Sequence, residues 1–336
     1  MTDLWGLLLL LSWDSVAASL MALGTLCGIN WTPQAYTLVN SGQVLAAVGA
    51  SAWLITLVAI RTLHSSSQSR AAAQIDAAFI VGTAGLYTAP DALVFICVLL
   101  WLALEICWRH GTTLSNLGIT PAPGARTTSG RARTCRVLYL SLLICAGASL
   151  GMTQLNLTVS ATGLALPVRQ ASQISAFDVT NEWQMIPFVA RTLIAEDLIL
   201  VAVVTALLTA ARRPVWQIYA ISSTLTLLTH AYLGVPALAT VAYAAARIWL
   251  YRRHGRLIPM ALGHGLWDTA VFILLPGTGI LITCTVGAVA FLIEWVLTPK
   301  PPKGSAPSAT PPTAARPLPL PAGETTRPTR VDAQDR

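Results

Sequence analysis

The chain has 336 residues, of which 54% are hydrophobic and only 10% are charged. Ordinary soluble domains contain about 25% charged residues, so this composition argues against a water-soluble globule. The net charge of +7 comes mainly from basic residues in the loops between apolar runs and in the C-terminal tail. That distribution indicates orientation in a lipid bilayer and not binding to nucleic acid.

Along the chain, apolar runs of about 17 to 25 residues follow one another. A helix of about 20 residues crosses the ~30 Å hydrocarbon core of a bilayer. The sequence therefore predicts an all-α polytopic bundle of about ten spans, with a range of eight to ten because the boundaries within residues 1–110 are the weakest. The expected spans are residues 4–28, 42–61, 71–89, 91–108, 137–157, 187–210, 215–233, 235–251, 257–275 and 279–297.

Twelve arginines fall in alternate loops, which gives the bundle an orientation. By the positive-inside rule these loops are cytoplasmic, so we expect a multi-pass protein of the cell membrane with both termini in the cytoplasm. The opposite loops hold only Arg169, with Arg191 at a helix entrance. The twelve are Arg61, Arg70, Arg109, Arg126, Arg131, Arg133, Arg136, Arg212, Arg213, Arg252, Arg253 and Arg256.

The runs and loops divide the chain into three parts. Residues 1–180 are expected to form N-terminal transmembrane helices, with a basic cytoplasmic loop at 109–136 and an outer loop at 158–186. Residues 185–298 form a second transmembrane core. Residues 299–336 hold 10 of the 20 prolines, and we expect them to be a disordered cytoplasmic tail.

Ionisable residues inside spans are candidate functional residues, because a charge at the bilayer centre costs about 2.5 to 3.5 kcal/mol. Five of them fall in three spans of the second core: Glu196, Asp197, His230, His264 and Asp268. Two adjacent carboxylates in a medium of low dielectric constant cannot both ionise cheaply. One of the acidic pair therefore suits a general base that acts on water, and Asp197 is expected to tune the ionisation of Glu196.

His264 and Asp268 are four residues apart, so on a helix their side chains face the same point. Such a pair serves as metal ligands, as an oriented acid or base, as a donor to an oxyanion, or simply as a packing contact. His230 precedes Gly234 and Pro236, which are expected to end its helix and open a polar pocket beside it. An acidic pair and two histidines on three successive spans can converge on a single water.

The order of these elements resembles the CAAX-protease and bacteriocin-processing (CPBP, or Abi) family of intramembrane proteases. The family pattern is Glu-Glu-x-x-x-Arg, then Phe-x-x-x-His, then His-x-x-x-Asn or Asp. Glu196-Asp197 is similar to the first motif, Thr226 to His230 to the second, and His264 to Asp268 to the third. The resemblance covers roughly residues 185–275. Three positions depart from it, namely Asp197 for Glu, Val201 for Arg and Thr226 for Phe.

The resemblance implies an intramembrane endopeptidase that hydrolyses a bond in a peptide or membrane-protein substrate. By this resemblance, Glu196 together with His230 would activate the water. His264 together with Asp268 would stabilise the oxyanion. Arg191 or Arg247 would replace the missing arginine of the first motif. A metalloprotease variant, in which His230, His264 and Asp268 hold one divalent ion such as zinc, stays open. So do a catalytically silent relative acting as a membrane scaffold or immunity factor, and a proton-coupled transporter.

Overall fold

The computed structural model describes residues 1–63, 92–120, 127–169 and 182–273, with four single positions beyond them. The expected span 71–89, the tail 299–336 and most of the expected span 279–297 lie outside the described residues. The chain divides at residue 298 into two units, and the helices below all belong to the first.

The described residues form helices and contain no β-strand, which confirms the all-α class. A single isolated backbone bridge joins Val168 to Gly234. The N-terminal helices are α1 (Thr2–Leu26), α2 (Pro33–Leu63), α4 (Ala92–Arg109) and α5 (Thr128–Thr162). The C-terminal elements are α7 (Glu182–Thr192), the π-helical η1 (Leu193–Val203), α8 (Val204–Ala210), α9 (Val215–Thr229), the 3₁₀ turns η2 (Ala231–Leu233) and η3 (Val235–Leu238), α10 (Ala239–His254) and α11 (Leu257–Ile273).

Three helical stretches within the described ranges are long and apolar enough to cross a membrane: Pro33–Arg61, Gly130–Thr162 and Gln184–Ala210. The number rises to four if the two halves of α1, which are bent by 40°, are counted as one span. The helices α9, α10 and α11 have 15, 16 and 17 residues, fewer than the ~20 that span a bilayer core. The expected number of about ten spans is therefore not confirmed.

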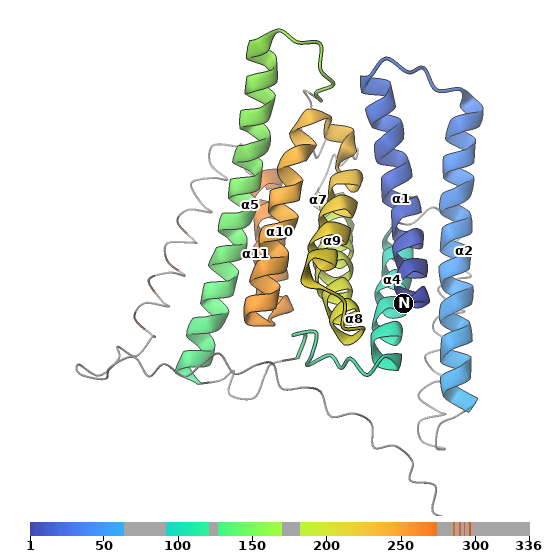
Figure 1. Cartoon of the computed structure of the whole chain (residues 1–336), viewed down its shortest axis with the longest axis vertical. Helices are drawn as coiled ribbons and strands as arrows, with labels where there is room; N and C mark the ends of the chain where they lie inside the picture. The colour runs from blue at the N-terminus through green and yellow to red at the C-terminus, as the bar shows by residue number, and fades with distance from the viewer. Residues whose placement is uncertain are drawn as a thin grey trace, which may run out of the picture. The chain divides into compact units, whose positions relative to one another are not determined.

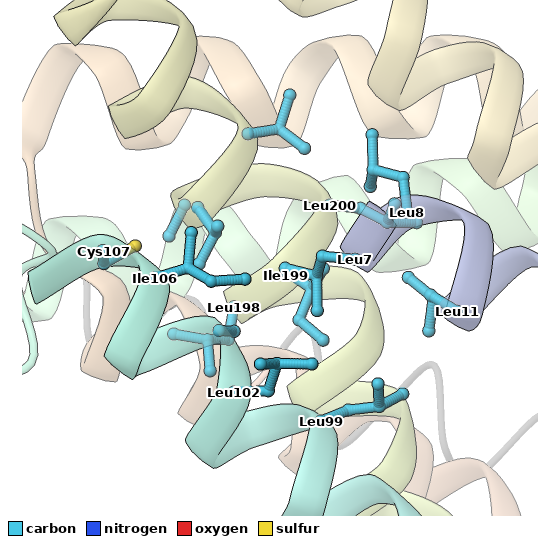
Figure 2. Packing of buried hydrophobic residues seen from close by; sticks show 14 of the residues in the cluster. Leu7, Leu8, Leu11, Leu99, Leu102, Ile106, Cys107, Leu198, Ile199 and Leu200 are labelled. Atoms are coloured by element: carbon cyan, nitrogen blue, oxygen red, sulfur yellow. The ribbon is translucent and has the colours of Figure 1, made fainter. Parts of the chain in front are cut away.

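The element η1 contacts helices from both halves of the chain, namely α4, α10 and α11. Helix α5 packs along α10 and α11 (Figure 1). Leucines and isoleucines of α1, α4 and η1 form the main hydrophobic cluster (Figure 2). Its core includes Leu7, Leu102 and Ile199, none of which is measurably exposed. This packing holds η1 in place, so that its polar side chains can face α10 and α11.

Gly263 allows α11 to approach α5 closely. A Cβ atom at this position would lie 2.7 Å from both the backbone oxygen of Leu138 and the Cβ of Ser141. Gly147 in α5, by contrast, has no neighbouring atom within 4 Å of such a Cβ.

Gly263→Ala is therefore expected to destabilise the protein by about 1–3 kcal/mol, because a backbone carbonyl must move to admit the methyl group. Gly147→Ala is the matched control, and it should be neutral or stabilising by up to ~1 kcal/mol, since alanine is the better helix former. Thermal unfolding of both variants in detergent measures the difference. Equal unfolding temperatures for the two variants would contradict the close approach of the helices.

The chain between α9 and α10 turns sharply at Gly234. Its φ angle of +73° is open mainly to glycine, and a Cβ there would collide with the backbone oxygen of Pro167. The backbone N–H of Val235 donates to that oxygen at 2.9 Å, and the N–H of Arg169 donates to the oxygen of Leu233 at 3.2 Å. Helix α9 thus ends directly before His230, and the segment that carries Arg169 is tied beside this end.

Candidate active site

The fold brings together four of the five titratable residues singled out in the sequence around one cavity of about 110 Å³. Glu196 reaches it from η1, His230 from the end of α9, and both His264 and Asp268 from α11. Asp197 does not line this cavity and lies behind it, with 1% of its surface exposed. Side chains from three separate segments therefore share one small space.

Glu196 and His230 face each other across this space. Their closest atoms, Glu196 Oε1 and His230 Nε2, are 3.7 Å apart, which is longer than a direct hydrogen bond. His230 Nδ1 lies 2.9 Å from the carbonyl oxygen of Thr226. Because a carbonyl only accepts, Nδ1 carries the proton and donates it, and Nε2 is the nitrogen turned to Glu196. The pair is arranged so that a water can contact both groups.

Asp197 has partners different from those of its neighbour Glu196. Its Oδ1 forms an ion pair with Nη2 of Arg247, and its Oδ2 accepts from His264 Nδ1 at 3.1 Å. Arg247 is as deeply buried as Asp197, and its Nη1 also donates to Ser141 Oγ. The buried charge of each is thus compensated by the other.

Arg247 supplies a guanidinium to one member of the acidic pair. Val201 stands where the motif pattern has arginine, and the guanidinium that pairs with Asp197 comes from α10. Arg191, the other candidate for this part, donates to Ser15 Oγ at 3.3 Å and lines a different cavity. Of the two arginines, the structure therefore places Arg247 at Asp197.

His264 is oriented by three neighbours. Its Nδ1 donates to Asp197, which leaves Nε2 directed to the cavity, 3.0 Å from the hydroxyl of Tyr243 and 3.6 Å from Oδ2 of Asp268. That Oδ2 atom is buried and has no hydrogen-bond partner among the described residues. A buried carboxylate oxygen without a hydrogen bond is costly, which indicates that this part of the cavity accommodates a donor.

Tyr243 is a site residue that the sequence did not single out. Its hydroxyl lies 3.4 Å from Glu196 Oε2, to which it donates, and 3.0 Å from His264 Nε2. The phenol therefore bridges the two sides of the cavity. The available signal is the spacing from Arg247, because residues four apart share one face of a helix.

The side chains do not form a metal site in this arrangement. In the part of the chain that the structure describes, no three or more His, Cys, Asp or Glu side chains gather closely enough to hold an ion. His230 lies with Glu196, while His264 is engaged with Asp197 and Tyr243. The set His230, His264 and Asp268 therefore does not fit a zinc centre as placed here.

Comparison with known families identifies the region that contains this site. Residues 179–270 match a family model described as Type II CAAX prenyl endopeptidase Rce1-like. The matched region includes all five titratable residues and Tyr243, and it confirms the resemblance to the CPBP proteases. Comparisons with curated proteins and with solved structures give no significant match.

Proposed function

We propose, from the premise that residues 179–270 form an Rce1-like domain, that the protein is an intramembrane endopeptidase of the CPBP type. Its substrate is a peptide or membrane protein, and its hydrolytic water is activated by Glu196 together with His230. The observation that carries the proposal is the convergence of Glu196, His230, His264 and Asp268 from three segments on one cavity of about 110 Å³.

The first step follows from the geometry of Glu196 and His230. A water held between Glu196 Oε1 and His230 Nε2 transfers a proton to the carboxylate as its oxygen attacks the carbonyl carbon of the substrate. The carbonyl of Thr226 holds His230 in the required tautomer and orientation. The bond that forms is carbon to oxygen, and the product of this step is a tetrahedral oxyanion.

The opposite wall of the cavity supplies the groups that face the oxyanion. The Tyr243 hydroxyl donates to Glu196 in the resting site and can turn to the oxyanion once Glu196 has taken the proton from water. A His264 that carries protons on both nitrogens donates from Nε2 while Nδ1 is held by Asp197. As the intermediate collapses, the C–N bond breaks and Glu196 returns its proton to the leaving amine. The carboxylate is thereby regenerated for the next turnover.

The orientation proposed from the arginine distribution adds a location to this activity. The protein is a multi-pass protein of the cell membrane, with both termini and the 109–136 loop in the cytoplasm. The substrate reaches the site within the bilayer or at its surface.

The test is cleavage of a peptide library by the purified full-length protein in liposomes, read by mass spectrometry with and without a zinc chelator. We expect cleavage that the chelator does not reduce, because in the proposed step Glu196 and His230 activate the water. Activity lost with the chelator and restored by zinc would overturn the metal-free mechanism. A silent relative or a transporter predicts no cleavage above that of the inactive Glu196→Gln protein, and that result would overturn the proposed function.

A further inference from the structure

A second cavity, of about 260 Å³, adjoins the candidate active site. Glu196, His230, Phe188 and Thr192 line both cavities, so the proposed catalytic pair stands where the two spaces meet. Helix α1 and the segment before residue 170 complete the walls of the larger space. A substrate whose scissile bond lies at Glu196 therefore has room to continue into this second cavity.

The second cavity contains two arginines. Arg169 and Arg191 both line it, and they are the two basic residues that the sequence places on the side opposite the twelve cytoplasmic ones. Among the described lining residues, the only carboxylate is Glu196, at the end shared with the active site. The remaining polar lining consists of serine, threonine, glutamine, tyrosine and histidine side chains. The described lining therefore has a net positive charge.

The guanidinium of Arg169 lacks one hydrogen-bond acceptor among the described residues. Its Nε atom is buried and has no hydrogen-bond acceptor among the described residues. Leaving a buried charged donor without an acceptor is unfavourable, so the guanidinium is arranged for an acceptor that a ligand brings. Its backbone is held by the hydrogen bond to Leu233 and by the bridge from Val168 to Gly234. This anchoring places the charge beside the end of α9, where His230 lies.

We propose that Arg169 and Arg191 bind a carboxylate of the peptide substrate in this cavity. The guanidinium is the side chain best suited to the task, because its planar fork matches the two oxygens of a carboxylate. The proposal rests on the proposed protease function and assigns its specificity to these two residues. Two sources of the carboxylate are compatible with the chemistry, namely the C-terminal end of the substrate or an acidic side chain.

The test measures binding and not hydrolysis, with full-length Glu196→Gln protein in detergent so that no peptide is consumed. Three probes are compared by calorimetry: acetyl-Ala-Val-Leu with a free carboxylate, the same peptide as its C-terminal amide, and acetyl-Ala-Val-Glu amide. We expect either the free-acid peptide or the glutamate peptide to bind at least about 10-fold more tightly than the uncharged acetyl-Ala-Val-Leu amide. Whichever of the two binds tightly identifies the source of the carboxylate.

Variants then assign the binding to the arginines. Introducing Arg169→Gln or Arg191→Gln should reduce the affinity for the charged peptide to that for the uncharged amide. Arg169→Lys should retain part of the preference, because it keeps the charge without the fork. Arg252→Gln is the matched control, since this arginine is exposed on α10 outside the cavity, and its affinity should not change.

The possible results separate this proposal from the protease function. Equal affinity for all three peptides would overturn the carboxylate site. So would a preference for the charged peptide that is as large in both glutamine variants as in the protein with both arginines. If one variant does not fold, the other and the comparison of peptides still decide the question. Preferential binding in a wild-type protein that cleaves nothing would support the carboxylate site and overturn the proposed hydrolysis.

Discussion

Replacement of Glu196 by glutamine is expected to abolish peptide hydrolysis while the protein stays folded. Glutamine has nearly the same shape, and its side-chain oxygen can still accept the hydrogen bond from Tyr243. It cannot take a proton from water, however, so the general base is lost. We expect kcat/KM to fall by about 10²–10⁴-fold, the usual contribution of a positioned base. Steady-state cleavage in liposomes measures the loss, and thermal unfolding checks the fold.

A second buried glutamate provides the control for this experiment. Glu105 in α4 is 3% exposed and forms an ion pair with Arg61 at 2.9 Å, and it lines neither cavity. Glu105→Gln should therefore lower stability but leave the activity per folded molecule unchanged. If Glu196→Gln retained wild-type activity, or if Glu105→Gln reduced activity equally, Glu196 would not be the base.

Much of the candidate site could be predicted from the sequence, because a charge within an apolar run must have a reason to be there. Glu196, His230, His264 and Asp268 stand out in the sequence for this reason, and the structure places all four around one cavity. Their helical spacing and the order of the motifs were sufficient to indicate convergence. The roles of these side chains in catalysis stay predictions until activity is measured.

The division of work within the acidic pair could not be predicted. Neighbouring residues on a helix point about 100° apart, so adjacent carboxylates need not share partners. In the structure Asp197 turns to Arg247 and His264, while Glu196 turns to His230 and Tyr243. A sequence shows that a buried charge needs a partner but not which distant residue supplies it. For the same reason Tyr243, an aromatic residue in an apolar helix, gave no signal of its own.

The local conformation of the backbone around Glu196 could not be predicted from the sequence either. The run around Glu196 predicts an ordinary α-helix, whereas Leu193–Val203 is π-helical. Such wide turns are rare and often lie at functional sites, because they change the direction of the side chains they carry. The number of spans likewise depends on where helices end. Helix α9 ends at Thr229, and a sharp turn with a positive φ angle follows at Gly234.

Replacement of Asp197 by asparagine is expected to destabilise the protein strongly. The sequence alone suggests a mild effect, on the view that Asp197 only tunes its neighbour. The structure instead pairs it with Arg247, and both side chains are 1% exposed. Asp197→Asn leaves the guanidinium buried without a compensating charge, which costs about 3–5 kcal/mol. Denaturant unfolding in detergent measures the loss, and hydrolysis per folded molecule should also fall because His264 loses its charged acceptor.

A double-mutant cycle separates the ion pair from the carboxylate itself. Arg247→Met removes the charge but keeps an unbranched apolar side chain, so the double variant Asp197→Asn with Arg247→Met leaves no unpaired charge. We expect it to be more stable than Asp197→Asn alone, because removing both charges of a buried pair costs less than removing one. Additive losses would show that the two residues act independently and would contradict the pairing. If the double variant is stable yet inactive, the pair serves function as well as stability, as expected if Asp197 orients His264 and the buried charge of Arg247 holds that carboxylate in place.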